Sequence, residues 1–476
     1  MSFYAILIIR GDILPTIVIN ENKIMCENGE NLYTVLLRGG IQLNAPCGGN
    51  GTCGKCYVWI DGIGKRKACE YIVTNNITVS TKIPRSEIAT KGMLRDVVLT
   101  NNEPCIAVDI GTTTVVVYAL QNGEILDIES SMNMQKSFGD DVLTRIKFTT
   151  ENQDGLQKLH NIIKKQIDEM FKTLCIRNSI ETDNIVIVGN TTMLHLYANI
   201  SPATIGVAPF TPVFTEMKRL GNTTLFPSFA GYVGGDIVSA ILASGMHLSK
   251  EKSLLLDIGT NAEIAFGNCE KIVVCAAAAG PAFEGAQISS GIGGVAGAIN
   301  SIVIDDKISY TTIDNVPPVG ICGSGILDAV SQMLKAGIID ETGFFEDEEL
   351  KITDNISVTA QDIREIQLAK AAIAAGIKTL LRETNSNLSD VENCYLAGGF
   401  GSYLNKQSAC NIGLLPSLLI DKIKSIGNAA GMGAVLWQIS DACKAEVQQI
   451  INITKYHELS GSSVFNEEFI NCMLFE

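Results

Sequence analysis

Four cysteines near the start of the chain have a spacing that suits a metal centre. Cys47, Cys53, Cys56 and Cys69 follow the pattern C-x5-C-x2-C-x12-C. Glycines between the first three let the backbone wrap tightly, so that sulfurs and N–H groups point inward. Four thiolates can hold a [2Fe–2S] cluster, whose negative charge the N–H groups stabilise. They also suit tetrahedral Zn²⁺, which is the alternative.

The distribution of the four sulfurs favours iron and sulfide over zinc. Structural zinc usually takes its ligands from two close pairs of cysteines. Here three sulfurs share one loop and the fourth comes later, a pattern that resembles ferredoxin domains of the C-x5-C-x2-C type. We expect Cys26, in the strand-like KIMCEN, to be buried rather than ligated. We expect GKRK (64–67) to form a solvated turn, with a docking patch for an acidic electron-transfer partner as the alternative.

A second motif occurs twice farther along the chain. CIAVDIGTTTVVVYAL (105–120) and LLLDIGTNAEIAFG (254–267) each join an apolar strand to a D-x-G-T turn. Such a turn aims backbone N–H groups and hydroxyls at a phosphate, while the aspartate holds Mg²⁺, usually through water. Two copies predict a nucleotide whose phosphates are held from both lobes of the protein. The predicted contacts are Asp109, Gly111, Thr112, Thr113 and Thr114 in the first copy and Asp257, Gly259, Thr260 and Asn261 in the second.

A third motif predicts the adenosine contact. CYLAGGFGSYLN (394–405) is expected to be a strand that runs into a glycine loop, with Gly398, Gly399 and Phe400 beside the adenosine. With SIGNAAGMGAVLW (425–437), the set resembles the phosphate-1, phosphate-2, adenosine and connecting motifs of the acetate kinase, sugar kinase, heat-shock chaperone and actin superfamily. The resemblance implies an actin-like, ribonuclease H-like ATPase.

Two further segments carry candidate site residues. YVGGDIVSAILASG resembles the GD-x-x-x-A segment of sugar kinases, which implies that Asp236 is a catalytic carboxylate, together with Asp109, and orients or deprotonates the attacking water. The alternative is an aspartate that caps a helix N-terminus. Gly323 and Ser324 precede a predicted helix and suit a phosphate, although close packing of small residues explains them nearly as well. His195 is expected to be structural.

Hydrophobic periodicity places the motifs on an α/β fold with two kinds of domain. Residues 1–80 alternate β-rich runs (FYAILII, PTIVIN, CYVWI, NITVS) around the helical NLYTVLLRGG, and predict a β-grasp, ferredoxin-like domain. Residues 81–104 show no clear periodicity and are predicted to be a linker.

The repeated motif predicts a duplicated body in the rest of the chain. Asp109 and Asp257 are 148 positions apart, which suits two related lobes at about 105–250 and 251–476 within an ATPase domain over 105–476. Apolar residues at helical spacing predict helices over 155–174 and 362–383.

Composition excludes several classes of protein. The net charge is −15, with 11 Lys/Arg and 9 Asp/Glu up to Pro104 and 25 and 42 beyond it, which argues against a nucleic-acid binder. No apolar run approaches the ~20 residues of a membrane span. Of 14 cysteines, ten lie singly, many in apolar stretches, as in a cytosolic protein with buried thiols. We therefore expect a cytoplasmic protein.

The order of ferredoxin domain, linker and two-lobed ATPase resembles the reductive activators of corrinoid-dependent methyltransferase systems over nearly the full chain. The matching stretches are APCGGNGTCGKC, AVDIGTTT, NMQKSFGDDVLTRI, VGNTTMLHL, APFTPVF, YVGGDI, LDIGTNAEI, GPAFEGA, GICGSGILD, DIREIQLAKAAI, LAGGFG and GNAAGMGA.

This resemblance implies an anaerobic activase that returns one electron to an inactive Co(II) corrinoid protein at the expense of ATP. It implies a [2Fe–2S] cluster, ATP with Mg²⁺, an upstream donor such as ferredoxin or flavodoxin, and a homodimer formed through the C-terminal part. The short linker, and no sign of an extra domain before the lobes, fit the smaller members, which serve O-demethylase or methylamine methyltransferase systems.

Two alternatives remain from the sequence. One is an activator of a radical dehydratase or aromatic reductase, which holds a [4Fe–4S] cluster between two subunits through cysteines of the ATPase lobes; Cys322 or Cys410 are the candidates here. The other is a redox-responsive binding protein that uses nucleotide only as a conformational switch.

Overall fold

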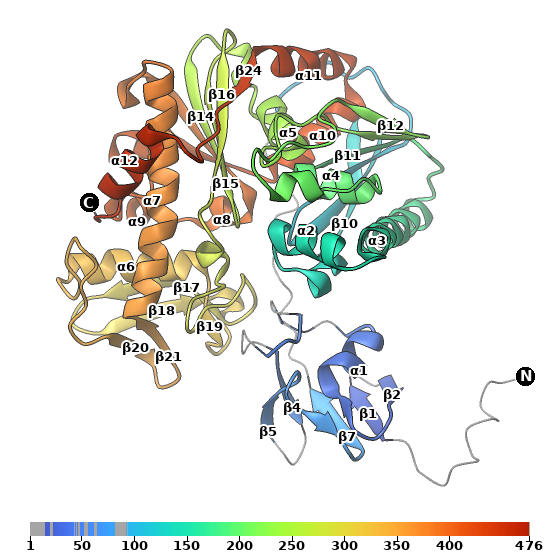
Figure 1. The fold of residues 1–476 in the computed structure, drawn as a ribbon, viewed down its shortest axis with the longest axis vertical. Coiled ribbons are helices and arrows are strands. Elements are labelled where there is room, and N and C mark those ends of the chain that lie inside the picture. Colours follow the sequence, from blue (N-terminus) through green and yellow to red (C-terminus); the bar gives the residue numbers. More distant parts are fainter. Residues whose placement is uncertain are drawn as a thin grey trace, which may run out of the picture. The chain divides into compact units, whose positions relative to one another are not determined.

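The protein has two compact units, which are described separately. In the computed structural model the described residues are 15–19, 22–41, 43, 45, 48–51, 56–60, 64–80, 92 and 94–475. The first unit is Met1–Arg85 and the second is Ser86–Glu476 (Figure 1).

The first unit is a mixed sheet with one helix. Strand order is β2-β1-β7-β4-β5, in which β1 and β7 are parallel and the other neighbours antiparallel. Side chains alternate along β1, so Ile17 and Ile19 enter the core. The elements are β1 (Thr16–Ile19), β2 (Asn22–Met25), β3 (Glu30–Asn31), α1 (Leu32–Arg38), β4 (Tyr57–Ile60), β5 (Gly64–Lys67), β6 (Ile72–Val73) and β7 (Ile77–Ser80).

The predicted β-grasp fold is thereby confirmed, with one local error. FYAILII lies outside the described residues, whereas PTIVIN, CYVWI, NITVS and the helix appear as predicted. GKRK is strand β5 rather than a turn. Within the described residues it pairs with β4 alone, at the edge of the sheet. Charged residues are common on edge strands, where they discourage pairing with another chain.

The second unit contains two six-stranded sheets that share the order of five strands and carry the sixth strand on opposite edges. In the first lobe the order is β10-β9-β8-β11-β13-β12 and in the second β23-β22-β14-β15-β16-β24. In the first lobe β8, β9 and β10, which follow one another in the chain, form an antiparallel meander, as β14, β15 and β16 do in the second lobe. A later strand then pairs parallel to the first strand of each meander: β11 to β8, and β22 to β14. The predicted duplication and actin-like architecture are confirmed by this repeated topology.

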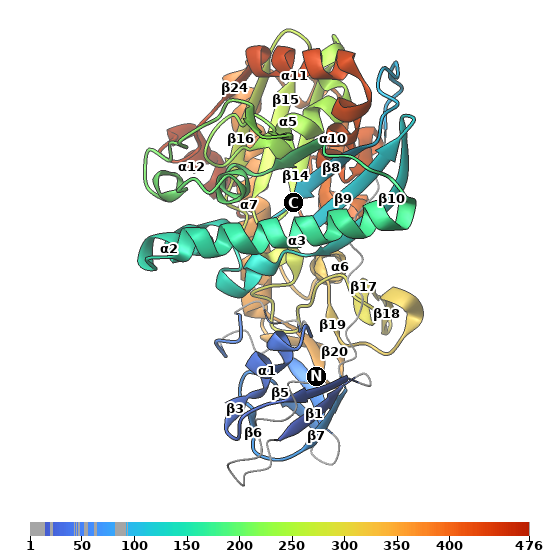
Figure 2. The ribbon, with the colours of Figure 1, turned by 90° about the vertical axis from the view of Figure 1, so that its right-hand side faces the viewer.

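The first lobe is built from β8 (Cys105–Ile110), β9 (Thr114–Gln121), β10 (Glu124–Met132), α2 (Val142–Glu151), α3 (Gly155–Asn178), β11 (Ile185–Gly189), α4 (Thr191–Tyr197), β12 (Lys218–Leu220), β13 (Thr223–Leu225) and α5 (Gly235–Ser244). Helix α3 packs across β9 and β10 and buries Leu159, Ile163 and Ile167, the face that the helical periodicity predicted (Figure 2).

The second lobe is larger because two small sheets and a helix follow its meander. Its elements are β14 (Lys252–Ile258), β15 (Ala262–Gly267), β16 (Ile272–Ala277), β17 (Ala298–Ile304), β18 (Ile308–Thr312), β19 (Gly320–Ile321), α6 (Gly323–Lys335), β20 (Glu349–Thr353), β21 (Ile356–Thr359), α7 (Ala360–Glu383), β22 (Val391–Ala397), α8 (Gly398–Tyr403), α9 (Lys406–Asn411), β23 (Ile423–Gly427), α10 (Ala429–Ile439), α11 (Asp441–Ile453), β24 (Thr454–Tyr456) and α12 (Ser463–Asn471). The long helix α7 is predicted correctly and packs along β15 and β16 (Figure 1).

Helices α5 and α10 pack closely where the two lobes join. A Cβ atom on Gly433 of α10 would lie 2.0 Å from the carbonyl oxygen of Ser239 in α5, so only glycine permits this separation. The Ser239 hydroxyl donates a hydrogen bond to the Ala430 carbonyl at 2.5 Å. The contact fixes α5, which carries Asp236 in its first turn, against α10.

The chain just before β8 lies along these same helices. Arg95 donates to the Leu242 carbonyl at the end of α5 and forms an ion pair with Glu446 of α11. The backbone N–H groups of Thr100 and Asn101 both donate to the Ile439 carbonyl of α10, at 3.0 and 3.2 Å. This part of the predicted linker therefore packs on the second unit; residues 81–91 and 93 lie outside the described residues.

Candidate functional site

The two D-x-G-T turns lie at corresponding edges of the two sheets. Asp109 is near the end of β8 and Asp257 near the end of β14, each beside a parallel strand that ends at the same edge. The Gly111 N–H donates to the Thr114 carbonyl at 2.8 Å, and the Gly259 N–H to the Asn261 carbonyl at 2.9 Å. In open α/β sheets, ligands bind at the carboxyl ends of parallel strands, so the geometry suits the predicted phosphate contacts.

Three buried or half-buried side chains hold the first turn in shape. Asn133 donates to the Gly111 carbonyl at 2.8 Å, and Asn190 donates to the Thr112 hydroxyl at 3.0 Å. The fully buried guanidinium of Arg145 donates to the Thr112 carbonyl at 2.6 Å. Burial lowers the pKa of Arg145 to about 10, so it is still a cation at neutral pH. A positive charge beneath the turn favours an anion on the other side of it.

The sequence analysis missed these three residues. Their stretches, NMQKSFGDDVLTRI and VGNTTMLHL, were noted only as family signatures. Because each residue lies 22–78 positions from its partner, no local pattern could reveal the contact. A polar residue that stands among apolar neighbours in a segment expected to be buried is the pattern that could have pointed to them.

Four acidic side chains, two of them from the D-x-G-T turns, interact electrostatically with one another. Asp109, Asp236, Asp257 and Glu263 are all half-buried. Burial raises the pKa of Asp109 to about 7, with Asp257 adding to the rise and a 2.9 Å hydrogen bond from Asn428 opposing it. Burial and then repulsion from Asp257 raise the pKa of Asp236 to about 7.

The other two carboxylates shift in the same direction. Burial raises the pKa of Asp257 to about 6. The pKa of Glu263 is raised well above its usual value, first by burial and then by Asp236 and Asp257. Glu263, from DIGTNAEI, was not among the predicted residues. A divalent cation would relieve this repulsion, so the donor set fits Mg²⁺ held with phosphate oxygens and water. Within the described part of the chain, no three His, Cys, Asp or Glu side chains form a metal site by themselves.

The candidate adenosine segment differs from the sequence expectation. Gly398, Gly399 and Phe400 begin helix α8 rather than a loop. Glycine disfavours helices, but tertiary contacts override that preference here. Gly398 has φ +82°, and a Cβ atom on it would lie 2.6 Å from the Asp257 carboxylate. The Phe400 ring stacks on Phe283, with ring centroids 4.8 Å apart.

Gly323 and Ser324 sit at the start of α6, where the contacts favour packing over phosphate binding. The Ser324 side chain is buried and donates its hydroxyl to the Asn300 carbonyl at 3.0 Å. A Cβ atom on Gly323 would lie 1.9 Å from the Phe283 carbonyl oxygen. His195 is buried as well, and both ring nitrogens are occupied by backbone groups of Thr191 and Val213, consistent with a structural role.

Asp236 is not a side-chain cap of α5. The N-cap position is Gly234, and the Asp236 carboxylate accepts a 2.9 Å hydrogen bond from the N–H of the next residue, Ile237. Its carboxylate instead shares the space with Asp109 and Asp257. This placement is compatible with the catalytic alternative, which stays a prediction.

Two of the four predicted cluster ligands belong to the described residues. Cys56 is buried and Cys69 half-buried, and the Cys69 N–H points at the Cys56 sulfur, 3.4 Å away. The Ala68 N–H donates to the Cys56 carbonyl at 2.8 Å, and Asn31 at the start of α1 donates to the Cys69 carbonyl at 2.7 Å. An N–H aimed at a sulfur fits an iron–sulfur site. Cys47 and Cys53 lie outside the described residues.

Cysteines elsewhere do not suit a cluster shared between two subunits. Cys322 and Cys410, the candidates for that alternative, are 5% and 1% exposed. The Cys322 thiol donates to the Ile299 carbonyl at 3.3 Å. A ligand to a cluster at a subunit interface must reach the surface, so these positions disfavour the dehydratase-activator alternative.

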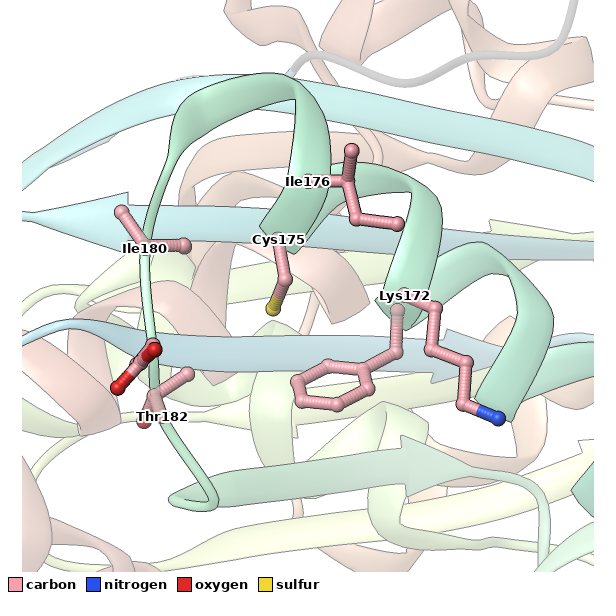
Figure 3. A pocket seen from close by; sticks show the side chains of 7 residues that line it. Lys172, Cys175, Ile176, Ile180 and Thr182 are labelled. Atoms are coloured by element: carbon pink, nitrogen blue, oxygen red, sulfur yellow. The ribbon is translucent and has the colours of Figure 1, made fainter.

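A separate cavity of about 250 Å³ opens at the C-terminal end of α3 (Figure 3). Phe171, Cys175, Ile176 and Ile180 make its lining mostly apolar, with Lys172 and Thr182 also lining it. It precedes β11, at the edge of the sheet opposite to the D-x-G-T turn. The cavity therefore takes no part in the candidate phosphate site.

Comparison with known proteins identifies the domains. Residues 16–84 match the family "2Fe-2S iron-sulfur cluster binding domain", 105–249 the "RACo middle region" and 251–476 the "C-terminal domain of RACo the ASKHA domain". The chain is 35% identical over 418 residues to "Corrinoid activation enzyme RamQ" of Eubacterium limosum, covering 78% of this chain and 70% of that protein. The chain belongs to the RACo family.

Two further RACo-family relatives agree. The chain is 26% identical to the "[Co(II) methylated amine-specific corrinoid protein] reductase" of Methanosarcina barkeri, over 68% of each chain. The structure of a "Reductive activator for corrinoid,iron-sulfur protein" superposes with a TM-score of 0.72 at 28% identity, covering 97% of this chain and 98% of that one. The resemblance stated from the sequence is confirmed, as are the fold and the predicted [2Fe–2S] and ATP cofactors, with Mg²⁺ the usual companion of ATP. No described helix has the length and apolar character to cross a bilayer.

The cluster assignment predicts different outcomes for two cysteines of the first unit. Cys69→Ala should lose the visible absorption of the cluster, because one of four thiolate ligands is removed. Cys26→Ala should keep it, because the buried Cys26 thiol donates instead to the Pro15 carbonyl at 3.5 Å. Iron and sulfide content of the purified variants checks both; loss of iron from both variants alike would contradict the assignment.

The raised carboxylate pKa values predict a pH-dependent effect on stability. A raised pKa in the folded state adds stability below the unfolded value, 3.8, that is lost as pH rises through about 7. Asp236→Asn should therefore raise the melting temperature of the nucleotide-free protein more at pH 8 than at pH 5. Asp306→Asn, at an exposed position, is the control and should change the two values equally. A shift from Asp236→Asn that is the same at both pH values would contradict the pKa assignment.

Proposed function

We propose that this chain is an ATP-dependent reductive activase that reduces the Co(II) centre of a corrinoid protein to Co(I). The observation that carries the proposal is the presence, in one chain, of four cysteines with ferredoxin-like spacing on a β-grasp domain and of two D-x-G-T turns. It is supported by the relatives, one named for corrinoid activation and the other for reduction of a Co(II) corrinoid protein.

The proposed reaction moves one electron from a low-potential donor to Co(II), coupled to the hydrolysis of ATP by water to ADP and phosphate. When the reduction potential of the cobalt centre lies below that of the donor, each electron costs about 2.3 kcal/mol per 100 mV of difference. A bound [2Fe–2S] cluster supplies one-electron transfer, and ATP supplies the free energy that biases a conformational step. Upstream, a ferredoxin or flavodoxin is the proposed class of donor.

Each candidate site residue of the second unit has a proposed role. The turns at Gly111–Thr114 and Gly259–Asn261 bind phosphate oxygens, and Asp109 and Asp257 hold the water shell of Mg²⁺. Asp236 orients the attacking water and, with a pKa of about 7, can accept its proton at neutral pH. Gly398 and Gly399 leave room for adenosine, as glycines permit close approach.

The activase proposal predicts separable effects of one substitution. Asp109→Ala should abolish ATP hydrolysis and the ATP-dependent appearance of Co(I) absorption in a mixture with reductant and a Co(II) corrinoid protein. The cluster spectrum should be unchanged, because Cys47, Cys53, Cys56 and Cys69 belong to the other unit. No Co(I) band with the wild-type protein, despite ATP hydrolysis, would reject the activase in favour of a nucleotide-switched binding protein.

We also propose a homodimer formed through the C-terminal part. Phe344, Ile470 and Leu474 are 65, 70 and 50% exposed, and the Phe475 N–H donates to the Glu341 carbonyl, which brings these segments together. An exposed apolar group of this kind is typical of an interaction surface.

We also propose a reducing, cytoplasmic setting, which is supported by the buried thiols of the second unit.

The dimer proposal predicts a change in mass. Ile470→Asp should convert a dimer into a monomer in sedimentation equilibrium, because a charge at an apolar contact is costly to bury. Ile176→Asp, which places the same charge on a side chain that is 81% exposed at the cavity of α3, should leave the dimer intact. A monomeric wild-type protein would overturn the proposal.

A further inference from the structure

Glu284 connects the two phosphate-binding turns. The Thr260 hydroxyl, in the second turn, donates to one carboxylate oxygen of Glu284 at 2.6 Å. The Thr113 hydroxyl, in the first turn, donates to the other oxygen at 3.4 Å. One side chain of the second lobe therefore accepts hydrogen bonds from both lobes.

The backbone around Glu284 is held firmly. Glu284 ends the short 3-10 helix Ala282–Glu284, in which Phe283 is buried and stacks on Phe400. Gly285 follows with φ +75°, and a Cβ atom on it would lie 2.4 Å from the Ile292 carbonyl oxygen. The carboxylate is therefore presented by a rigid segment, not by a loose loop.

The two hydroxyls that bind Glu284 are among the donors that the two turns are predicted to offer to a phosphate. A hydroxyl has one proton, so it cannot donate to the carboxylate and to a phosphate oxygen at the same time. The carboxylate is also an anion, as is the phosphate. The same two turns carry Asp109 and Asp257, so a further negative group beside them opposes phosphate entry.

We propose that Glu284 is a clasp that ties the lobes together without nucleotide and that the phosphates of the nucleotide must displace. This inference rests on the proposed nucleotide site. Phosphate entry would release Thr113 and Thr260 from Glu284, and phosphate departure would restore both hydrogen bonds. The clasp makes the lobe-to-lobe connection depend on whether phosphate is present.

Binding of the non-hydrolysable analogue AMP-PNP with Mg²⁺, measured by calorimetry on the full chain, tests the clasp. Glu284→Gln keeps the size of the side chain but removes its charge and one acceptor oxygen. The dissociation constant for AMP-PNP should fall by about tenfold, because a competing anion is removed. Adenosine, which has no phosphate, should bind the variant and the wild type equally. Glu270→Gln removes the same charge at an exposed position and is the control.

The outcomes distinguish failure of the clasp proposal from failure of the nucleotide-site proposal. Failure of the wild type to bind AMP-PNP would overturn the nucleotide site itself. Wild-type binding with an unchanged constant in Glu284→Gln would overturn the clasp alone. Weaker AMP-PNP binding in the variant would show that Glu284 helps to hold the nucleotide, which also overturns the clasp. If Glu284→Gln does not fold, Glu284→Asp, one methylene too short to reach both hydroxyls, should strengthen AMP-PNP binding in the same direction.

Discussion

Repulsion among half-buried carboxylates is the constraint on which the candidate site depends. Asp109 and Asp257 occupy equivalent places because the two lobes repeat one order of five strands, and Asp236 and Glu263 are added to the pair. Collecting four acids costs folding free energy, as their raised pKa values indicate. Clusters of perturbed carboxylates are typical of sites that bind a cation or transfer a proton, which makes this edge of the two sheets the candidate site of the second unit.

Glycine contacts bring these acids together. Gly398 lies against the Asp257 carboxylate, and Gly433 lets α10 approach α5 at Ser239. Asn428 begins α10 and donates to Asp109, so the packing of α10 on α5 also sets the position of a carboxylate in the other lobe. The contact between the two lobes therefore shares residues with the candidate phosphate site.

The segment before β8 packs against the same joint between the lobes within the second unit. Gly92 forms an isolated antiparallel bridge with Gly427, next to Asn428, and Arg95 binds the end of α5. The chain that leaves the cluster domain therefore contacts both helices of the joint. A change in the angle between α5 and α10 would therefore alter the contacts that this segment makes within the second unit.

Local chemistry in the sequence revealed the turns and the cysteines because their residue types are rarely combined for any other purpose. The C-x5-C-x2-C loop, the two copies of D-x-G-T and the long periodic helices could all be recognised within windows of about twenty residues. Propensity failed at GGFG and GKRK, where stacking of Phe400 on Phe283 and pairing of β5 with β4 outweighed local preference.

Only the tertiary structure decided which polar residues complete the site. Arg145 lies 33 positions from Thr112, Glu284 lies 171 from Thr113, and Asn428 lies 319 from Asp109. Contacts over such separations arise from the packing of whole sheets and helices, and no pattern within either segment records its partner. The sequence alone determined what chemistry is available to this protein; the duplicated fold decided which side chains share that chemistry, because it brings two sheet edges to one place.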